Sequence, residues 1–245
     1  MITKDTPKKL FLLDAFALIY RSYFAFSNNP RINSKGFNTS AIFGFCNTLL
    51  EILNKEKPTH IAVVFDTDEP TQRHIEFESY KANREEMPED LRKSIPFIID
   101  LIKAFNIEVI GIPGFEADDL IGTLARKAET SGFTTYMMTP DKDYGQLVDE
   151  NTFIYKPARL GNGVEILGVN EICKKWEITN VNQVIDILGL MGDSVDNIPG
   201  IPGVGEKTAI KFVQEYGSVE GLLQNTDKLK GKMKEKVEAN KDLAI

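Results

Sequence analysis

The sequence is poor in the features that mark secreted, membrane-spanning and strongly basic proteins. It has only two cysteines, Cys46 and Cys173, far apart in apolar-periodic segments, and no apolar run long enough to span a membrane. We therefore expect two buried free thiols, as in a reducing cytoplasm, and no membrane partner. The net charge of −7 argues weakly against a nucleic-acid partner, which usually wants a basic surface, although an acidic metal centre could account for much of that charge.

The length of 245 residues is enough for one large or two small domains with a real core. Up to about residue 168, short apolar strands alternate with helical segments; beyond it, short helices follow one another through tight Gly/Pro turns. This pattern predicts an α/β fold, with a mostly parallel central sheet flanked by helices in residues 1–168 and a helical subdomain in residues 169–245. The last residues stop without a capping signal, so we expect a piece of a longer protein.

The individual elements follow from apolar periodicity and turn residues. A polar stretch at residues 67–89 has little periodicity and should project from the body. The predicted strands are residues 9–14, 60–66, 107–110 and 133–139, and residues 153–166 resemble a hairpin that turns at Gly161-Asn162-Gly163. The predicted helices are residues 15–25, 38–53, 91–105, 116–130, 170–176, 181–191, 206–216, 219–223 and 232–245.

Carboxylates gather where the predicted strands end. Because the carboxyl ends of parallel strands meet at one edge of a sheet, we expect these side chains to come together. For the three carboxylates of GFEADD, mutual repulsion and desolvation should raise the pKa values unless a cation lies among them, and Mg²⁺ and Mn²⁺ prefer oxygen ligands. At any single position an aspartate could instead cap a helix or lie in its first turn, where the helix dipole favours negative charge. The strand-end residues are Asp14, Asp66 and Asp141, with Asp143 close behind, and the motif GFEADD adds Glu116, Asp118 and Asp119.

A second group of residues lies in the C-terminal part. The stretch GIPGVGEKTA at residues 200–209 allows a tight hairpin between two helices. Backbone N–H groups at the start of the second helix, with Lys207 beside them, form a site for a phosphate, and the alternative is an ordinary helix–helix turn. Just upstream, Asp193 and Asp196 are three residues apart, so on a helical turn they would share a face.

These motifs carry a resemblance to a known family. The order LFLLD, VVFD, YKANR, GFEADD, TPDKD, GDSVDN and GIPGVGEKTA strongly resembles the 5′-nuclease domain of bacterial DNA polymerase I, which belongs to the flap endonuclease family. The resemblance implies a PIN-like nuclease core with a helical arch over the active site, and a helix-hairpin-helix subdomain that holds duplex DNA. It also implies metal-dependent 5′-3′ exonuclease and 5′-flap endonuclease activity in replication and repair.

The resemblance further implies partners and a location. The partner would be DNA with 5′ flaps, nicks or junctions, bound without base specificity. The chain would be a monomer joined to a polymerase domain in the full-length protein, in the bacterial cytoplasm with the nucleoid. The cofactors would be two or more Mg²⁺ or Mn²⁺ ions, with K⁺ at the helix-hairpin-helix.

Carried over position by position, the resemblance also assigns roles to residues. Tyr20 would stack on a base near the cleaved bond, and Lys81 and Arg84 would contact the scissile phosphate. The metal ligands would be Asp14, Asp66, Glu116, Asp118, Asp119, Asp141, Asp143, Asp193 and Asp196. Duplex phosphates would lie at Gly203, Val204, Gly205, Lys207 and Thr208, and K⁺ at the carbonyls of Leu190, Met191, Pro199, Ile201 and Val204.

Two other functions compete with this one. The stretch VVFDTDEPT resembles the DxDxT motif of haloacid-dehalogenase-like phosphatases, but the threonine falls one place late, at Thr71, and Pro70 occupies its position. That interpretation leaves Asp14, the GFEADD motif and the hairpin unexplained. A non-catalytic DNA-junction-binding module is the third alternative, and the intact acidic set argues against it because unpaired carboxylates beside DNA weaken binding.

Overall fold

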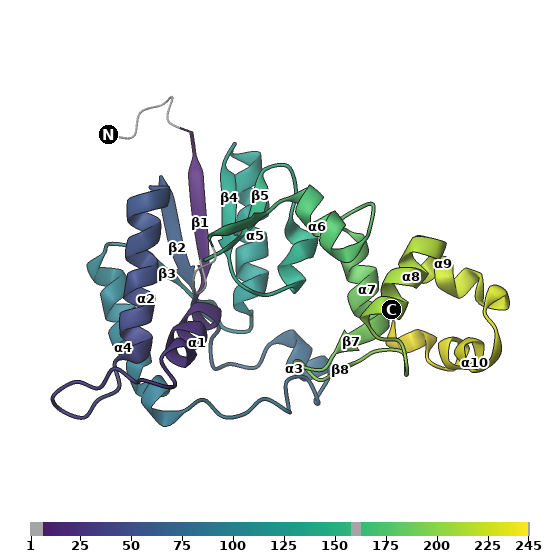
Figure 1. The fold of residues 1–245 in the computed structure, drawn as a ribbon, viewed down its shortest axis with the longest axis horizontal. Coiled ribbons are helices and arrows are strands. Elements are labelled where there is room, and N and C mark those ends of the chain that lie inside the picture. The colour runs from purple at the N-terminus through teal and green to yellow at the C-terminus, as the bar shows by residue number, and fades with distance from the viewer. Residues whose placement is uncertain (1–6, 158–162, 245) are drawn as a thin grey trace. The chain divides into compact units, whose positions relative to one another are not determined.

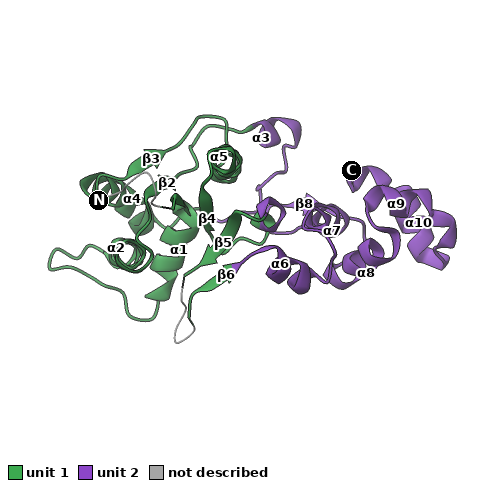
Figure 2. Cartoon of the chain, turned by 90° about the horizontal axis from the view of Figure 1, so that it is seen from above, with its two compact units in different colours: residues 1–71, 86–144, 150–166 green, residues 72–85, 145–149, 167–245 purple. Residues whose placement is uncertain are grey.

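The computed structural model describes residues 7–157 and 163–244, which form two compact units (Figure 2). Unit 1 takes the described residues up to 71 together with residues 86–144 and the described part of 150–166. Unit 2 takes the C-terminal residues from 167 and also two earlier segments, residues 72–85 and 145–149. The second unit is therefore assembled from three separate parts of the chain.

Unit 1 is built on a six-stranded sheet with the order β3-β2-β1-β4-β5-β6, typical of doubly wound folds (Figure 1). The pairs β1–β2, β1–β4, β2–β3 and β4–β5 are all parallel, so the predicted mostly parallel sheet is confirmed. Residues 161 and 162 of the predicted hairpin turn lie outside the described residues. The strands are β1 (Lys9–Asp14), β2 (His60–Val64), β3 (Glu108–Ile110), β4 (Thr134–Met138), β5 (Thr152–Lys156) and β6 (Glu165–Leu167).

Helices cover both faces of this sheet. Phe11 and Leu13 of β1 belong to a core shared with α1, α2 and α4, whereas the alternate residue Leu12 faces the side where α5 packs on β1, β2 and β4. Burial on both faces explains why the strands read as nearly continuous apolar runs. The helices are α1 (Ala15–Ala25), α2 (Ser40–Glu51) with a π-helical extension (Ile52–Glu56), α4 (Glu89–Ala104) and α5 (Ala117–Thr130).

The register places the carboxyl ends of the central strands level with one another. Leu13 of β1 lies opposite Val63 of β2 on one side and Met138 of β4 on the other. The strand order reverses between β1 and β4, which is the point where open parallel sheets bind ligands. The residues that follow these three strands therefore meet at one edge.

Unit 2 is mainly helical and has its own core, which includes Trp176, Leu190 and Phe212. A short antiparallel ladder, β7 (Gly192–Asp193) with β8 (Ile198–Pro199), lies between two of its helices. The polar stretch predicted to project contains α3 (Gln72–Glu76), followed by turns. The other helices are α6 (Val169–Trp176), α7 (Gln183–Met191), α8 (Glu206–Tyr216), α9 (Val219–Gln224) and α10 (Gly231–Ala239), with 3₁₀ turns at Asp143–Leu147, Thr226–Lys228 and Lys241–Leu243.

The prediction that Asp193 and Asp196 share a face of a helical turn is wrong. Asp193 is the second residue of β7, and Asp196 lies in the turn that leads to β8. Gly192 ends α7 with a φ of 69°, and Asn197 in the turn also has a positive φ, 57°. These left-handed residues convert the predicted helical turn into a small hairpin.

The structure bears on the two cysteines and on the question of a membrane-spanning helix. Both cysteines are free, as expected, but each is only partly buried. None of the helices in residues 7–157 and 163–244 combines the length and apolar character that crossing a bilayer requires.

The hairpin of unit 2 depends on a close approach between Gly192 and Gly200. A Cβ atom on Gly200 would overlap the backbone of Met191 and Gly192, and one on Gly192 would lie 2.5 Å from the Ile198 carbonyl oxygen. Neither position can accept a side chain without moving backbone, because real Cβ atoms do not approach other atoms so closely.

We therefore expect Gly200→Ala to destabilise unit 2 by about 1–3 kcal/mol, the usual cost of forcing an extra carbon into a packed site. Gly145→Ala is the matched control, because its new Cβ would meet Ile172 and Val184 at an ordinary 3.7 Å. Thermal unfolding followed by circular dichroism measures both variants. Equal melting temperatures for the two variants would contradict the tight packing described here.

Candidate functional site

Asp14 lies at the carboxyl end of β1 and interacts with two different elements. Its Oδ1 accepts the Ala17 N–H at 3.2 Å, so it caps α1. Its Oδ2 accepts the Thr139 hydroxyl at 3.0 Å and, at a longer 3.4 Å, the Tyr144 hydroxyl. The capping role and the strand-end cluster were alternatives in the sequence, and the structure shows that one carboxylate takes part in both.

The start of α5 places a second set of carboxylates. Asp66, two residues beyond β2, accepts the Ala117 N–H on Oδ1 at 3.0 Å. Glu116 is the N-cap residue, and its own N–H donates to Asp119 Oδ2 at 3.2 Å in a capping box. Glu116 is only 3% exposed and accepts the Thr71 hydroxyl at 3.4 Å. Helix-start donors thus hold these acidic groups near the sheet edge.

Beyond β4, Thr139 connects two of the predicted ligands. Its side chain is fully buried; the hydroxyl donates to Asp14 and accepts the Asp141 N–H at 3.2 Å. Asp141 Oδ1 in turn accepts the Asp143 N–H at 3.0 Å. The ends of β1 and β4 are therefore tied together through one threonine hydroxyl.

The electrostatics bring four aspartates into one neighbourhood. Burial is the largest cause of the raised pKa of Asp14, which is about 6. The hydrogen bonds from Ala17 and Thr139 lower the pKa, and the charges of Asp66 and Asp141 raise it. Burial also raises the pKa of the Tyr144 phenol, and the further causes are the charges of Asp14, Asp118, Asp141 and Asp66. A single buried hydroxyl is therefore within electrostatic reach of all four carboxylates.

The oxygen atoms of this cluster suit a hard cation as ligands, although the side chains are not already spaced to coordinate one. Within the described ranges, no three or more histidine, cysteine, aspartate or glutamate side chains are already spaced to hold a metal ion. The cluster offers only oxygen donors whose repulsion a divalent cation would relieve, which is the chemistry that Mg²⁺ and Mn²⁺ prefer.

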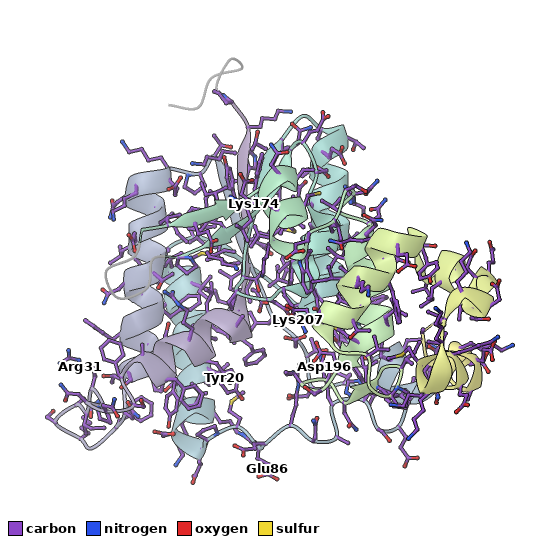
Figure 3. The ribbon with its side chains drawn as sticks, turned by 45° about the vertical axis from the view of Figure 1, so that its right-hand side comes forward. Tyr20, Arg31, Glu86, Lys174, Asp196 and Lys207 are labelled. Carbon is purple, nitrogen blue, oxygen red and sulfur yellow. The ribbon has the colours of Figure 1, made fainter. Side chains whose placement is uncertain are left out.

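Unit 2 contains four of the other predicted residues, Lys81, Arg84, Asp193 and Asp196, and joins the first two to Asp196. Asp196 lies in the turn between β7 and β8 (Figure 3). Its Oδ1 forms an ion pair with the Arg84 guanidinium at 2.5 Å, and its carbonyl accepts the Lys81 N–H at 2.9 Å. Asp193 Oδ1 accepts the Val195 N–H at 2.7 Å. Residues far apart in the sequence thus lie side by side within this unit.

Tyr20 lies on α1 of unit 1 (Figure 3). Its ring is partly buried against the core and stacks on Phe24, with ring centroids 6.2 Å apart. Phe24 is 56% exposed, so the pair extends from the core toward the surface.

The glycine-rich loop of unit 2 leads directly into α8. Gly203 has a φ of 86°, and Gly205 is the N-cap residue of the helix. Lys207 lies exposed in the first turn (Figure 3), and the Thr208 N–H donates back to the Gly205 carbonyl at 2.9 Å. The Lys236 ammonium, from α10, lies beside Gly203.

The carbonyls predicted for K⁺ belong to the same region. The Leu190 carbonyl accepts the Ile201 N–H, and the Ile201 carbonyl accepts the Val204 N–H, each at 2.9 Å. Met191 ends α7, and Pro199 lies in β8.

Sequence patterns did not identify Thr139 and Tyr144 as partners of Asp14. Thr139 is the first residue after β4, so the strand-end rule that singled out the aspartates also applies to it. What the rule lacks is the strand order, because only the adjacency of β4 and β1 brings the Thr139 hydroxyl to Asp14.

Comparison with protein families finds two models that together span nearly the whole chain. Residues 9–177 match "5'-3' exonuclease, N-terminal resolvase-like domain", and residues 179–245 match "5'-3' exonuclease, C-terminal SAM fold". The first match alone covers more than half of the chain.

Individual relatives agree with these models. The chain is 44% identical over 240 residues to DNA polymerase I of Bacillus subtilis (strain 168), covering 97% of this chain and 27% of that protein. It is 38% identical over 221 residues to the 5'-3' exonuclease of Aquifex aeolicus (strain VF5), covering 90% and 74%. The chain thus spans about a quarter of the length of the polymerase relative.

Solved structures share the fold. One is the flap endonuclease of bacteriophage T5 in a pseudo-enzyme-product complex with DNA and metal ions, with a TM-score of 0.77, 19% identity, and coverage of 96% of this chain and 86% of that one. Another is the catalytic core of Rad2 in complex with DNA substrate, with a TM-score of 0.58, 20% identity, and coverage of 98% and 74%.

The raised pKa of Asp14 leads to a prediction about pH. In metal-free buffer, protonated Asp14 contributes stability that is fully present below 3.8, the pKa of aspartate in the unfolded chain. This stability is lost as pH rises through the folded-state pKa of about 6. The loss amounts to about 3 kcal/mol for a shift of this size. Asp14→Asn cannot ionise, and asparagine still caps α1. The variant should therefore show a flatter profile between pH 4 and 6 and exceed the wild type in stability above pH 6.

Urea unfolding in the presence of a chelator, repeated across this pH range, measures the difference. Asp100→Asn, an exposed site on α4, is the control and should keep the wild-type pH profile. Parallel profiles for Asp14→Asn and the wild type would mean that the Asp14 carboxylate is not destabilised by burial and its neighbours.

Proposed function

Because the chain belongs to the 5′-3′ exonuclease family, we propose that it is a divalent-metal-dependent 5′-3′ exonuclease and structure-specific 5′-flap endonuclease of DNA replication and repair. It is a hydrolase that cleaves phosphodiester bonds. The carboxylate cluster at the carboxyl ends of the unit 1 strands is the observation that carries this function, since four aspartates all lie within electrostatic reach of the buried Tyr144 hydroxyl. A phosphodiester is a poor electrophile surrounded by negative charge, and an acidic cluster can act on it only through bound cations.

The cluster of Asp14, Asp66, Asp118 and Asp141 would hold Mg²⁺ or Mn²⁺. Divalent ions there would supply the activation of a water and the stabilisation of charge on the scissile phosphate and the leaving oxygen. Two ions do not need all nine carboxylates as direct ligands, so some act by orienting the others or through water. Thr139 has that orienting role, because its hydroxyl fixes Asp14 relative to Asp141. The remaining members of the proposed set are Glu116, Asp119, Asp143, Asp193 and Asp196.

Three residues act on the substrate directly in this proposal. Lys81 and Arg84 neutralise charge that develops on the scissile phosphate. Tyr20 stacks on a base near the cleaved bond, and its stacking on Phe24 supports an aromatic surface for that purpose.

The helix-hairpin-helix would hold the duplex through its backbone. The exposed Lys207 at the start of α8 and the N–H groups of that first turn suit phosphate oxygens, which carry no base identity. The DNA-binding residues would be Gly203, Val204, Gly205, Lys207 and Thr208, and K⁺ would take the carbonyls of Leu190, Met191, Pro199, Ile201 and Val204.

On the scale of the whole protein, we propose a catalytic domain at residues 1–168 and a DNA-binding subdomain at residues 169–245. DNA with 5′ flaps, nicks or junctions is the partner, and the chain is a monomer joined to a polymerase domain in the bacterial cytoplasm with the nucleoid. The match to about a quarter of a DNA polymerase I supports the polymerase linkage.

The first test of this function compares DNA and a small ester. We expect Mg²⁺-dependent cleavage of a 5′-flap duplex and no phosphate release from a small phosphomonoester. Asp118→Asn should lower flap cleavage by several orders of magnitude while flap affinity falls little or rises, because a negative charge beside the phosphate is removed. Single-turnover cleavage and fluorescence anisotropy measure the two effects.

Asp100→Asn is the control for the change of charge and should cleave normally. Phosphate release from the ester would support the phosphatase instead, and binding without cleavage would support the non-catalytic module. Near-normal cleavage by Asp118→Asn would remove that residue from the metal centre.

The phosphate grip has its own test. Lys207→Ala should weaken duplex binding similarly for unrelated sequences and reduce the slope of log affinity against log salt by roughly one unit. Lys174→Ala, an exposed lysine on α6 (Figure 3), carries the same charge change and should keep the wild-type slope. A loss confined to one DNA sequence would refute a grip on the backbone.

A further inference from the structure

Two segments of unit 2 are interlocked by reciprocal hydrogen bonds. We call residues 79–84 the arm and residues 193–197 the acidic loop. The Asn83 amide donates to the Ser194 carbonyl and the Asn197 amide donates to the Ser79 carbonyl, each at 2.7 Å. The two segments lie more than a hundred residues apart in the sequence, so only the tertiary structure pairs them.

Asp196 is at the centre of this contact. Its Oδ1 binds the Arg84 guanidinium at 2.5 Å, its Oδ2 accepts the Tyr80 hydroxyl at 3.3 Å, and its carbonyl accepts the Lys81 N–H. Tyr80 is only 6% exposed and packs edge-on against His74, with ring centroids 5.0 Å apart. A buried tyrosine therefore anchors the arm, whereas the Arg84 side chain remains 50% exposed.

The side chains of Asp196 and Arg84 have conflicting tasks in the proposed function. Asp196 would be a metal ligand, and Arg84 would contact the scissile phosphate, yet here each neutralises the other. A guanidinium and a divalent cation compete for the same carboxylate oxygens, because both are attracted by its charge. An ion pair whose arginine is half exposed is weak enough to be exchanged, since water already solvates much of that side chain.

We propose that the arm is a counter-ion latch: Asp196 holds Arg84 until a divalent cation binds at Asp193 and Asp196 and displaces it. The released guanidinium is then available to a phosphate of the DNA. This inference rests on the proposed function, because it takes Asp193 and Asp196 as metal-binding residues. It couples loading of the metal to release of the residue that contacts the substrate, so the arm engages DNA only after the acidic loop has bound its ion.

The latch implies a reciprocal effect that can be measured without any nuclease activity. If the cation weakens the Arg84–Asp196 pair, then the pair must weaken cation binding by the same factor. Arg84→Gln should therefore tighten Mn²⁺ binding at one class of sites, by roughly 5-fold or more if the coupling has its usual size. The double variant Arg84→Gln/Asp196→Asn should lose that gain.

Limited trypsin digestion of the full chain tests the release itself, because the protease must take the Arg84 side chain into its own pocket. Mg²⁺ should accelerate cleavage after Arg84 in the wild type by roughly 5-fold or more. Asp196→Asn should be cut rapidly with or without Mg²⁺. Asn83→Ala, which loses an arm contact but no charge, should be cut faster without Mg²⁺ and still respond to it. Asp227→Asn, an exposed site of unit 2, is the charge-matched control and should behave as the wild type.

Electron paramagnetic resonance counts Mn²⁺ binding in the same samples. If the wild type binds Mn²⁺ but Mg²⁺ leaves cleavage after Arg84 unchanged or slows it, the latch is overturned while the metal-dependent function stands. If the wild type binds no Mn²⁺, both the latch and the proposed metal chemistry fail. Equal Mn²⁺ affinity in the wild type and Arg84→Gln would also overturn the latch.

Discussion

The desolvation of Asp14 beside other carboxylates, at one edge of a parallel sheet, is the constraint on which the acidic cluster of unit 1 depends. Burial carries the main cost and raises the pKa of Asp14, and the charges of Asp66 and Asp141 add to it. Backbone donors at helix starts offset part of this cost, since Ala17 binds Asp14 and Ala117 binds Asp66. The first turns of α1 and α5 therefore serve as electrostatic support as well as helix ends.

Unit 2 handles its acidic residues differently. Asp196 is neutralised by a guanidinium and a buried tyrosine hydroxyl rather than by helix-start N–H groups. The two units thus hold their acidic residues through different kinds of partner.

Several predictions from the sequence agree closely with the structure. The bounds predicted for α1 and α8, residues 15–25 and 206–216, are those observed; Asp14 marks the start of α1, and Gly205 and Gly217 mark both ends of α8. The parallel sheet and the family resemblance are confirmed. The helical turn expected for Asp193 and Asp196 was wrong, because two close glycines allow β7 and β8 to pair there. The assignments of individual metal and DNA ligands stay predictions.

By itself the sequence determined which residues carry charge at the ends of strands, and hence that an acidic site forms, because the carboxyl ends of parallel strands always emerge on the same edge. Only the tertiary structure decided which partner each carboxylate has. The adjacency of β1 and β4 brings the Thr139 hydroxyl to Asp14, and the inclusion of residues 72–85 in unit 2 brings Arg84 to Asp196. Both contacts join residues more than a hundred positions apart, and local periodicity contains no information about pairs at that separation.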